Sequence, residues 1–223
     1  MFSGFLSILN ASEHRFIYAA WLIIIAGIFD ALDGLVARLT RSSSELGVEL
    51  DSLSDIISFG AAPSFLMYST YLRNLNDWGI IISSLPLIAG GFRLARFNVQ
   101  LVGFDKEYFK GLPIPTSAIT LAAFVLAYFK PSSGYMQPYQ NYIIPLIILL
   151  SFLMVSRIRY ETFPKPTISE IKAKPFHFIF ILIMIIALIM SSGKALVYIF
   201  VFIILFGIFR HIYMKFFKSS ANV

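Results

Sequence analysis

The sequence predicts an all-α integral membrane protein, built as a polytopic helical bundle. Of its 223 residues, 58% are hydrophobic and 13% are charged, whereas soluble domains contain about 25% charged residues. The apolar runs are too long for strands and lack the alternation of a membrane barrel. This composition excludes a disordered chain, and the absence of cysteine excludes a disulfide scaffold and a thiolate metal site.

Seven apolar stretches predict the helices, since one crossing of a bilayer takes about 20 apolar residues. They lie at residues 15–39, 47–71, 78–97, 115–130, 140–156, 175–191 and 194–214. Proline, serine and glycine at 131–134 and 191–193 predict turns between helices. The apolar stretch 1–11 comes before them and is about half as long as a span. We therefore expect a half-helix there, or residues missing before Met1.

The basic residues predict how the helices are oriented. Fourteen of the 18 lysines and arginines lie on one side of the predicted spans, and the positive-inside rule places that side in the cytosol. The net charge of +6 is compatible with nucleic-acid binding, but these residues lie in loops between apolar runs, so anionic lipid headgroups are the nearer partner. We expect a multi-pass protein of the cytoplasmic membrane, in contact with membrane lipids and not with nucleic acid.

Acidic residues concentrate at the cytosolic ends of the first two long helices. Asp30 and Asp33 are three residues apart and share one helix face. Asp51 and Asp55 are four residues apart and also share a face. The short connection between the two helices makes them antiparallel neighbours. The four carboxylates can then converge on one point below the cytosolic surface.

A convergent set of carboxylates predicts a divalent-metal site. Intramembrane carboxylates are costly and are functional by default, and four anions cannot share a pocket of low dielectric unpaired. Arg38 supplies only one positive charge. Oxygen ligands favour Mg²⁺, Mn²⁺ or Ca²⁺ over zinc and copper, and two metal ions about 3.5–4 Å apart are the usual clamp for phosphoryl displacement. Gly34 and Gly47 leave room for a ligand.

Two other interpretations of the acidic residues stay open. A single acid at a helix end is usually a cap or a solvated charge, which is the simpler interpretation of Glu45 and accounts equally well for Glu49. A divalent-cation transport protein would also carry intramembrane acids, but acidic rings in channels line a through-pore. Here the apolar stretch 56–71 follows the acids and offers no polar path.

The order of residues from Asp30 to Asp55 resembles the signature of the CDP-alcohol phosphotransferase family at every fixed position. In one-letter form it reads D-x2-D-G-x2-A-R-x8-G-x3-D-x3-D, which is eight fixed residues over 26 positions. The strings SFGAAP at 58–63, FRLARFN at 92–98, GLPIP at 111–115 and LMVS at 153–156 look like the phosphatidylserine synthase branch of that family. The resemblance covers roughly residues 4–160.

The resemblance implies a fold, a reaction and a set of residue roles. The fold is a six-helix catalytic core at residues 1–160 with a C-terminal extension of two transmembrane helices at 161–223, assembled as a homodimer. The reaction transfers a phosphatidyl or archaetidyl group from CDP-diacylglycerol or CDP-archaeol to an alcohol and releases CMP. Two divalent cations would bind Asp30, Asp33, Asp51 and Asp55, with Asp55 also the general base, and the CDP-lipid site would include Gly34, Ala37, Arg38 and Gly47.

The helix at 78–97 carries the residues predicted to bind the acceptor alcohol. Arg93 and Arg96 lie near its cytosolic end without an acidic neighbour in the sequence, and intramembrane arginines need an anion. The carboxylate of an amino acid fits, and so does the phosphate of glycerol 3-phosphate or inositol phosphate, so charge alone does not decide. The FRLARFN string favours L-serine by resemblance. Asn98 would complete the serine site, and Glu49 would hold the serine ammonium.

Overall fold

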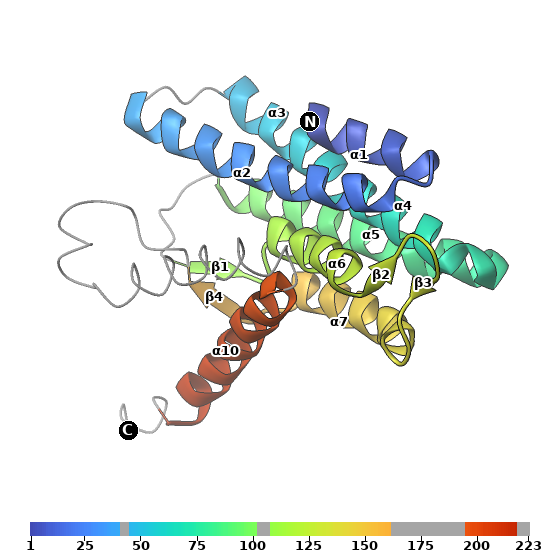
Figure 1. Cartoon of the computed structure of the whole chain (residues 1–223). Coiled ribbons are helices and arrows are strands. Elements are labelled where there is room, and N and C mark those ends of the chain that lie inside the picture. The colour runs from blue at the N-terminus through green and yellow to red at the C-terminus, as the bar shows by residue number, and fades with distance from the viewer. Residues whose placement is uncertain (41–44, 102–107, 162–194, 218–223) are drawn as a thin grey trace.

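The protein is a bundle of helices with two short strand pairs (Figure 1). The computed structural model describes residues 1–40, 45–101, 108–161 and 195–217. The prediction of a helical fold is confirmed in that part of the chain, where the strands are only two or three residues long. The helix predicted at 175–191 lies outside the described residues.

The first two helices form an antiparallel pair. α1 (Phe2–Ser12) occupies the short apolar stretch, and α2 (Phe16–Thr40) is the first long predicted helix. The chain reverses at His14, whose φ of 60° lies in the left-handed region. The buried Ser7 donates a hydrogen bond from its Oγ to the carbonyl of Ala19 at 2.8 Å. This bond ties α1 to α2 in apolar surroundings.

A continuous helical segment from Glu45 to Thr70 follows. It consists of α3 (Glu45–Asp55), the π-helical turn η1 (Ile56–Ala61) and α4 (Ala62–Thr70). The apolar pattern at 47–71 predicts this helix but not the π turn. Such turns are rare and occur mostly at functional sites. Here the turn begins directly after Asp55, one of the predicted metal ligands.

Close packing holds α1 against η1. A β-carbon built on Gly4 would lie 2.6 Å from both the Cα and the Oγ of Ser58, which is too short for any side chain. Only glycine therefore lets the α1 backbone approach η1 at this point. The contact brings the N-terminal part of α1 next to the turn that follows Asp55.

The remaining helices correspond to those predicted at 78–97, 115–130, 140–156 and 194–214, with ends shifted by a few residues. They are α5 (Asn76–Leu101), α6 (Ile114–Tyr128), α7 (Ile143–Val155) and α10 (Ala195–Phe217). Two 3₁₀ turns, η2 (Leu72–Leu75) and η3 (Tyr139–Tyr142), precede α5 and α7. β2 (Phe129–Lys130) pairs with β3 (Gly134–Tyr135), and β1 (Tyr108–Lys110) pairs antiparallel with β4 (Arg159–Glu161).

The core of the bundle is built around α6. Twelve of its 15 residues are buried, and it packs against α2, α4, α5, α7 and α10 (Figure 1). Fully buried apolar side chains such as Leu121, Leu66 and Ile147 fill the space between these helices. The predicted site residues lie on α2, α3 and α5, so they are held by helices that a common core fixes in place.

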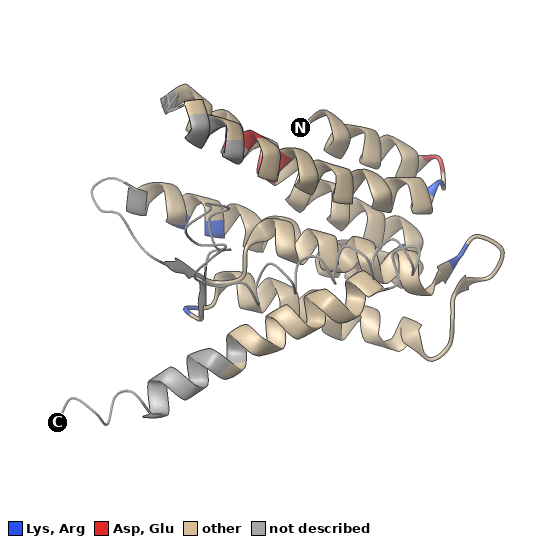
Figure 2. Ribbon diagram, turned by 60° about the vertical axis from the view of Figure 1, so that its left-hand side comes forward, with Lys and Arg blue, Asp and Glu red and all other residues tan. Residues whose placement is uncertain are grey.

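Two helical stretches in the described part of the chain are long and apolar enough to cross a bilayer, Phe16–Gly34 and Leu72–Val99. Less than half of each stretch is buried inside the molecule, whereas the core helix of a soluble protein is mostly buried. Ile25, Ile80 and Ile88 are exposed on them, which suits contact with lipid. Figure 2 shows that few charged side chains interrupt these helices.

Candidate active site

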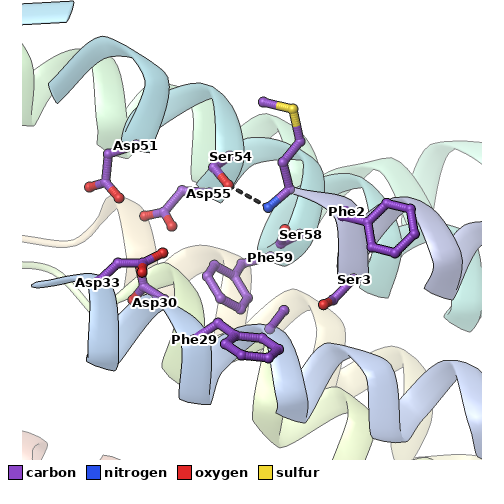
Figure 3. Close-up of a pocket in the computed structure, with 12 residues that line it drawn as sticks. Phe2, Ser3, Phe29, Asp30, Asp33, Asp51, Ser54, Asp55, Ser58 and Phe59 are labelled. Atoms are coloured by element: carbon purple, nitrogen blue, oxygen red, sulfur yellow. Dashed lines mark hydrogen bonds between the residues drawn. The ribbon is translucent and has the colours of Figure 1, made fainter. Parts of the chain in front are cut away.

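Three carboxylates converge between the middle of α2 and the C-terminal end of α3. Asp30 is on α2, Asp51 and Asp55 are on α3, and one oxygen from each lies within 4.8 Å of the others. Figure 3 shows these side chains pointing toward one another across the space between the two helices. Asp30 and Asp55 are half-buried and Asp51 is exposed. The cluster can therefore be reached from outside the bundle.

Asp33, the fourth predicted carboxylate, lies beside this group and not within it. It is exposed, it lines the same cavity as the other three, and it interacts electrostatically with Asp30 and Asp51. The spacing of three residues on α2 and four on α3 accounts for this arrangement, because such residues share a helix face. The convergence expected from the sequence is thus present, with three of the four side chains in the closest group.

The carboxylates form one end of a cavity of about 260 Å³. The residues around it come from α1, α2, α3 and η1: Met1, Phe2, Ser3, Ala26, Phe29, Asp30, Asp33, Asp51, Ser54, Asp55, Ser58 and Phe59. Figure 3 shows the aspartates at one end, the hydroxyl-bearing Ser54 and Ser58 next along the α3–η1 wall, and Phe2 at the far end. The cavity therefore changes from anionic to apolar along its length.

The acidic end of the cavity fits a divalent cation. Asp30, Asp51 and Asp55 repel one another, and the Arg93 guanidinium interacts favourably with Asp55. The Met1 ammonium also interacts favourably with Asp30 and Asp55, but these two cationic groups offset only part of the repulsion among three carboxylates. Mg²⁺ holds oxygen ligands at about 2.0–2.1 Å, so opposite ligands lie about 4.2 Å apart, and the three carboxylate oxygens here all lie within 4.8 Å of one another. These carboxylates could hold Mg²⁺ or Mn²⁺.

Of the four residues predicted for the CDP-lipid site, the structure describes the exposure of two, Gly34 and Gly47. Gly34 is exposed on α2, and a β-carbon there would meet nothing within 4 Å. Gly47 is exposed on α3. Ala37 and Arg38 belong to α2 by their backbone, and their side chains lie outside the described part of the structure. The open space over Gly34 would let a flat base or sugar approach the helix backbone.

The two arginines predicted for the acceptor site lie in different surroundings on α5. Arg93 is only 7% exposed and interacts with Asp55. Arg96 donates from Nη1 to the carbonyl of Val155 at 2.9 Å and from Nη2 to the carbonyl of Ser156 at 3.4 Å. It thereby caps the C-terminal end of α7, where backbone carbonyls have no partner within the helix.

Asn98 and Glu49, the other residues predicted for the acceptor site, also have different surroundings. Asn98 donates from Nδ2 to the Oγ of Ser52 at 3.1 Å, which links α5 to α3. Glu49 is exposed on α3 and does not line the cavity. None of the four predicted residues lines the cavity, and Arg93 is the one whose charge interacts favourably with Asp55.

Eight of the twelve residues around the cavity were not predicted as part of the site, among them Ser54, Ser58, Phe29 and Phe59. Each serine follows an α3 aspartate by three residues, a spacing that places side chains on neighbouring parts of a helix face. That spacing is a signal by which the sequence could have indicated them. The phenylalanines offer no such signal, because aromatic residues are common throughout membrane helices.

Similarity to known proteins covers the segment that carries the site. A family model described as CDP-alcohol phosphatidyltransferase matches residues 1–153. A CDP-diacylglycerol--serine O-phosphatidyltransferase of Helicobacter pylori (strain ATCC 700392 / 26695) is 40% identical over 169 residues, which are 74% of this chain and 69% of that protein. An archaetidylserine synthase of Methanothermobacter thermautotrophicus is 40% identical over 164 residues, 71% of this chain and 64% of that protein. A CDP-diacylglycerol--serine O-phosphatidyltransferase of Bacillus subtilis is 34% identical over 176 residues, which are 76% of this chain and 89% of that protein.

Proposed function

Because the chain belongs to the CDP-alcohol phosphatidyltransferase family, we propose that it transfers a phosphatidyl or archaetidyl group from a CDP-linked lipid to the hydroxyl of L-serine and releases CMP. The names of its relatives support serine as the acceptor, since two of them are serine O-phosphatidyltransferases and one is an archaetidylserine synthase. The donor would be CDP-diacylglycerol or CDP-archaeol.

The observation that carries this proposal is the convergence of Asp30, Asp51 and Asp55. Three carboxylates this close, two of them half-buried, are unfavourable unless cations neutralise them. With Asp33 they would form the ligand set of two divalent cations, Mg²⁺ or Mn²⁺. When bound, such cations supply the positive charge that holds a diphosphate and stabilises the negative charge on departing CMP.

Asp55 is the proposed general base. The serine oxygen attacks the phosphorus that bears the lipid, a new P–O bond forms, and the P–O bond to CMP breaks with its electron pair leaving on CMP. Asp55 accepts the hydroxyl proton during the attack, because a neutral hydroxyl is a weak nucleophile. Its place in the carboxylate cluster at the cavity supports this role.

Arg93 is the proposed anchor for the serine carboxylate. A planar guanidinium can form two parallel hydrogen bonds to a carboxylate. Since Arg93 also interacts with Asp55, a serine held there would have its hydroxyl beside the base. Arg96, Asn98 and Glu49 stay predicted members of the same site, and Arg96 and Asn98 have partners on α7 and α3 as well.

In the proposed orientation, the active site faces the cytosol from the cytoplasmic membrane. The excess of basic residues on the side of the aspartates supports this orientation. The lipid donor would then arrive from the bilayer and serine from the cytosol. The homodimer, and the division into a catalytic domain at 1–160 and an extension at 161–223, stay predictions from the family resemblance.

An acceptor panel with CMP release as the readout tests the proposal. The purified protein is incubated with CDP-diacylglycerol, Mg²⁺ or Mn²⁺, and either L-serine, glycerol 3-phosphate or inositol phosphate. We expect CMP release with serine, loss of release when EDTA is added, and recovery when the cation is restored. Release that requires glycerol 3-phosphate or inositol phosphate would overturn serine as the acceptor. Cation flux into proteoliposomes without CMP formation would indicate a transport protein.

A further inference from the structure

The helix that carries two of the three clustered carboxylates, α3, is only lightly packed. None of its described side chains is buried, since residues 46–51 and Leu53 are exposed and the other three are half-buried. In α6, by contrast, twelve of the 15 residues are buried. Apolar contacts therefore do little to fix the place of α3, and its polar contacts with neighbouring helices matter more.

A hydrogen bond between two side chains joins α3 to α5. Asn98 on α5 donates from Nδ2 to the Oγ of Ser52 on α3 at 3.1 Å, and the Ser52 hydroxyl also lies 3.5 Å from the Oδ1 of Asn98. Both side chains are half-buried, so the bond is partly shielded from water. Three residues further along α3, Asp55 interacts with Arg93 of the same helix α5. Two polar contacts thus set how α3 lies along α5.

The bond between Asn98 and Ser52 lies outside the cavity. Neither residue lines it, whereas Asp51 and Asp55 do. Figure 3 shows these two aspartates pointing toward Asp30 on α2. The bond therefore ties α3 to α5 by a different side of the helix and leaves the side with the carboxylates open to the cavity.

Repulsion among the carboxylates works against this arrangement as long as no cation is bound. Asp30 is repelled by both α3 aspartates, and α3 could relieve this repulsion by turning about its own axis or by sliding along α5. The bond between Asn98 and Ser52 opposes both movements. If α3 holds the binding arrangement for only part of the time, the apparent affinity for a cation falls by that fraction.

We propose that Asn98 is a positioning residue, which through its hydrogen bond to Ser52 holds α3 where Asp51 and Asp55 meet Asp30 around a divalent cation. This role differs from the contact with serine that the sequence predicts for Asn98. The inference rests on the proposed function for its consequence in catalysis, whereas its effect on cation binding can be measured without any substrate.

The test measures Mn²⁺ binding to the purified full chain, with free Mn²⁺ followed by electron paramagnetic resonance. We expect Asn98→Ala and Ser52→Ala each to raise the Kd for Mn²⁺ about threefold to tenfold. The double variant should match the single ones within about twofold, because both changes remove the same bond. Ser52→Thr keeps the hydroxyl and should bind Mn²⁺ as the wild-type protein does. Ser84→Ala is the matched control, since the exposed Ser84 donates only to the Ile81 carbonyl of its own helix.

CMP release then separates positioning from contact with serine. At saturating Mn²⁺ the serine KM of both alanine variants should stay within about twofold of the wild-type value. A serine KM raised in Asn98→Ala but not in Ser52→Ala would place Asn98 in the serine pocket and overturn the inference. An unchanged Kd for Mn²⁺, with or without a lower melting temperature, would also overturn it, as would additive losses in the double variant. Should Asn98→Ala fail to fold, the comparison of Ser52→Ala with Ser52→Thr decides in the same way. A wild-type protein that binds Mn²⁺ but releases no CMP with any acceptor would instead refute the proposed function.

Discussion

One carboxylate oxygen from each of Asp30, Asp51 and Asp55 lies within 4.8 Å of the others, so their negative charges repel one another. In water such repulsion is screened, but at the edge of an apolar bundle it acts at low dielectric. The helix spacing imposes this closeness, because both α3 aspartates project from one face toward α2. The electrostatic repulsion among the carboxylates therefore destabilises the cation-free protein, and a bound cation would remove that repulsion.

At this scale we expect Asp55→Asn to lower kcat about 10²–10⁴-fold, the range for loss of a general base. The asparagine keeps the shape of the side chain and removes one repelling charge. In EDTA, without a cation, the variant should therefore be at least as stable as the wild-type protein. Asp77→Asn is the matched control, since Asp77 is exposed at the start of α5, about 24 Å along the helix from Arg93. CMP release and thermal unfolding in detergent are the measurements. A near-normal rate in Asp55→Asn would exclude it as the base.

The second residue-scale prediction concerns Arg93. We expect Arg93→Lys to raise the serine KM about tenfold or more, because an ammonium cannot form the paired hydrogen bonds of a guanidinium. The KM for the CDP-lipid should change little. Arg73→Lys is the control, since Arg73 is exposed before α5 and far from the cavity. An unaltered serine KM, or an equal rise for both substrates, would argue against Arg93 as the serine anchor.

Among the elements, the corner between β1 and α6 depends on a single glycine. Gly111 has a φ of 87° and donates its N–H to the Ile158 carbonyl at 2.8 Å. A β-carbon on it would overlap the backbone carbonyl of Met154, at the end of α7. The same end of α7 accepts the hydrogen bond of Arg96 from α5. One compact corner thus joins α5, α6 and α7 beside the site.

A pair of glycine substitutions tests this corner. Gly134 also has a positive φ, of 73°, but a β-carbon there would meet nothing within 4 Å. We expect Gly134→Ala to lower the free energy of unfolding by about 1–2 kcal/mol, the cost of a left-handed alanine. Gly111→Ala should lower it by about 3 kcal/mol or more, because overlap adds to that cost. The melting temperature in detergent should fall less in Gly134→Ala than in Gly111→Ala. Equal decreases would show that the backbone around Gly111 accommodates the β-carbon without added strain.

For the whole molecule, the uneven distribution of charge is the basis of the proposed orientation in a membrane. Few residues of the described helices are charged (Figure 2), while fourteen of the 18 basic residues lie on one predicted side. Anionic headgroups and the positive-inside rule then favour a single orientation. That orientation would put the aspartates, the diphosphate of the donor and soluble serine on the same side of the bilayer.

Single cysteines can test the orientation, because the chain has no cysteine of its own. Ser132, in the turn between β2 and β3, and Arg157, just after α7, are both exposed and lie at opposite ends of α7. We expect an impermeant maleimide to label Ser132→Cys in intact cells and Arg157→Cys only after the membrane is permeabilised. The opposite pattern would place the active site on the outer side.

Local patterns in the chain are enough to predict the helices that carry the site and the acids that meet there. Helix spacing is local, so the faces of α2 and α3 that carry Asp30, Asp51 and Asp55 follow from residue numbers alone. Apolar length likewise predicted α2, α5, α6, α7 and α10 to within a few residues. The chemistry of oxygen ligands then indicated divalent cations before any side chain was placed.

Only the tertiary structure decided which partner each side chain takes. The residues of η1 (Ile56–Ala61) fit an α turn and a π turn equally well by sequence. The structure shows a π turn there, with Gly4 of α1 packed against Ser58. Arg93 and Arg96 are equivalent by charge, yet one interacts with Asp55 and the other caps α7. The reason is that periodicity fixes the direction of a side chain around its own helix, while its partner depends on which other helix packs against that face.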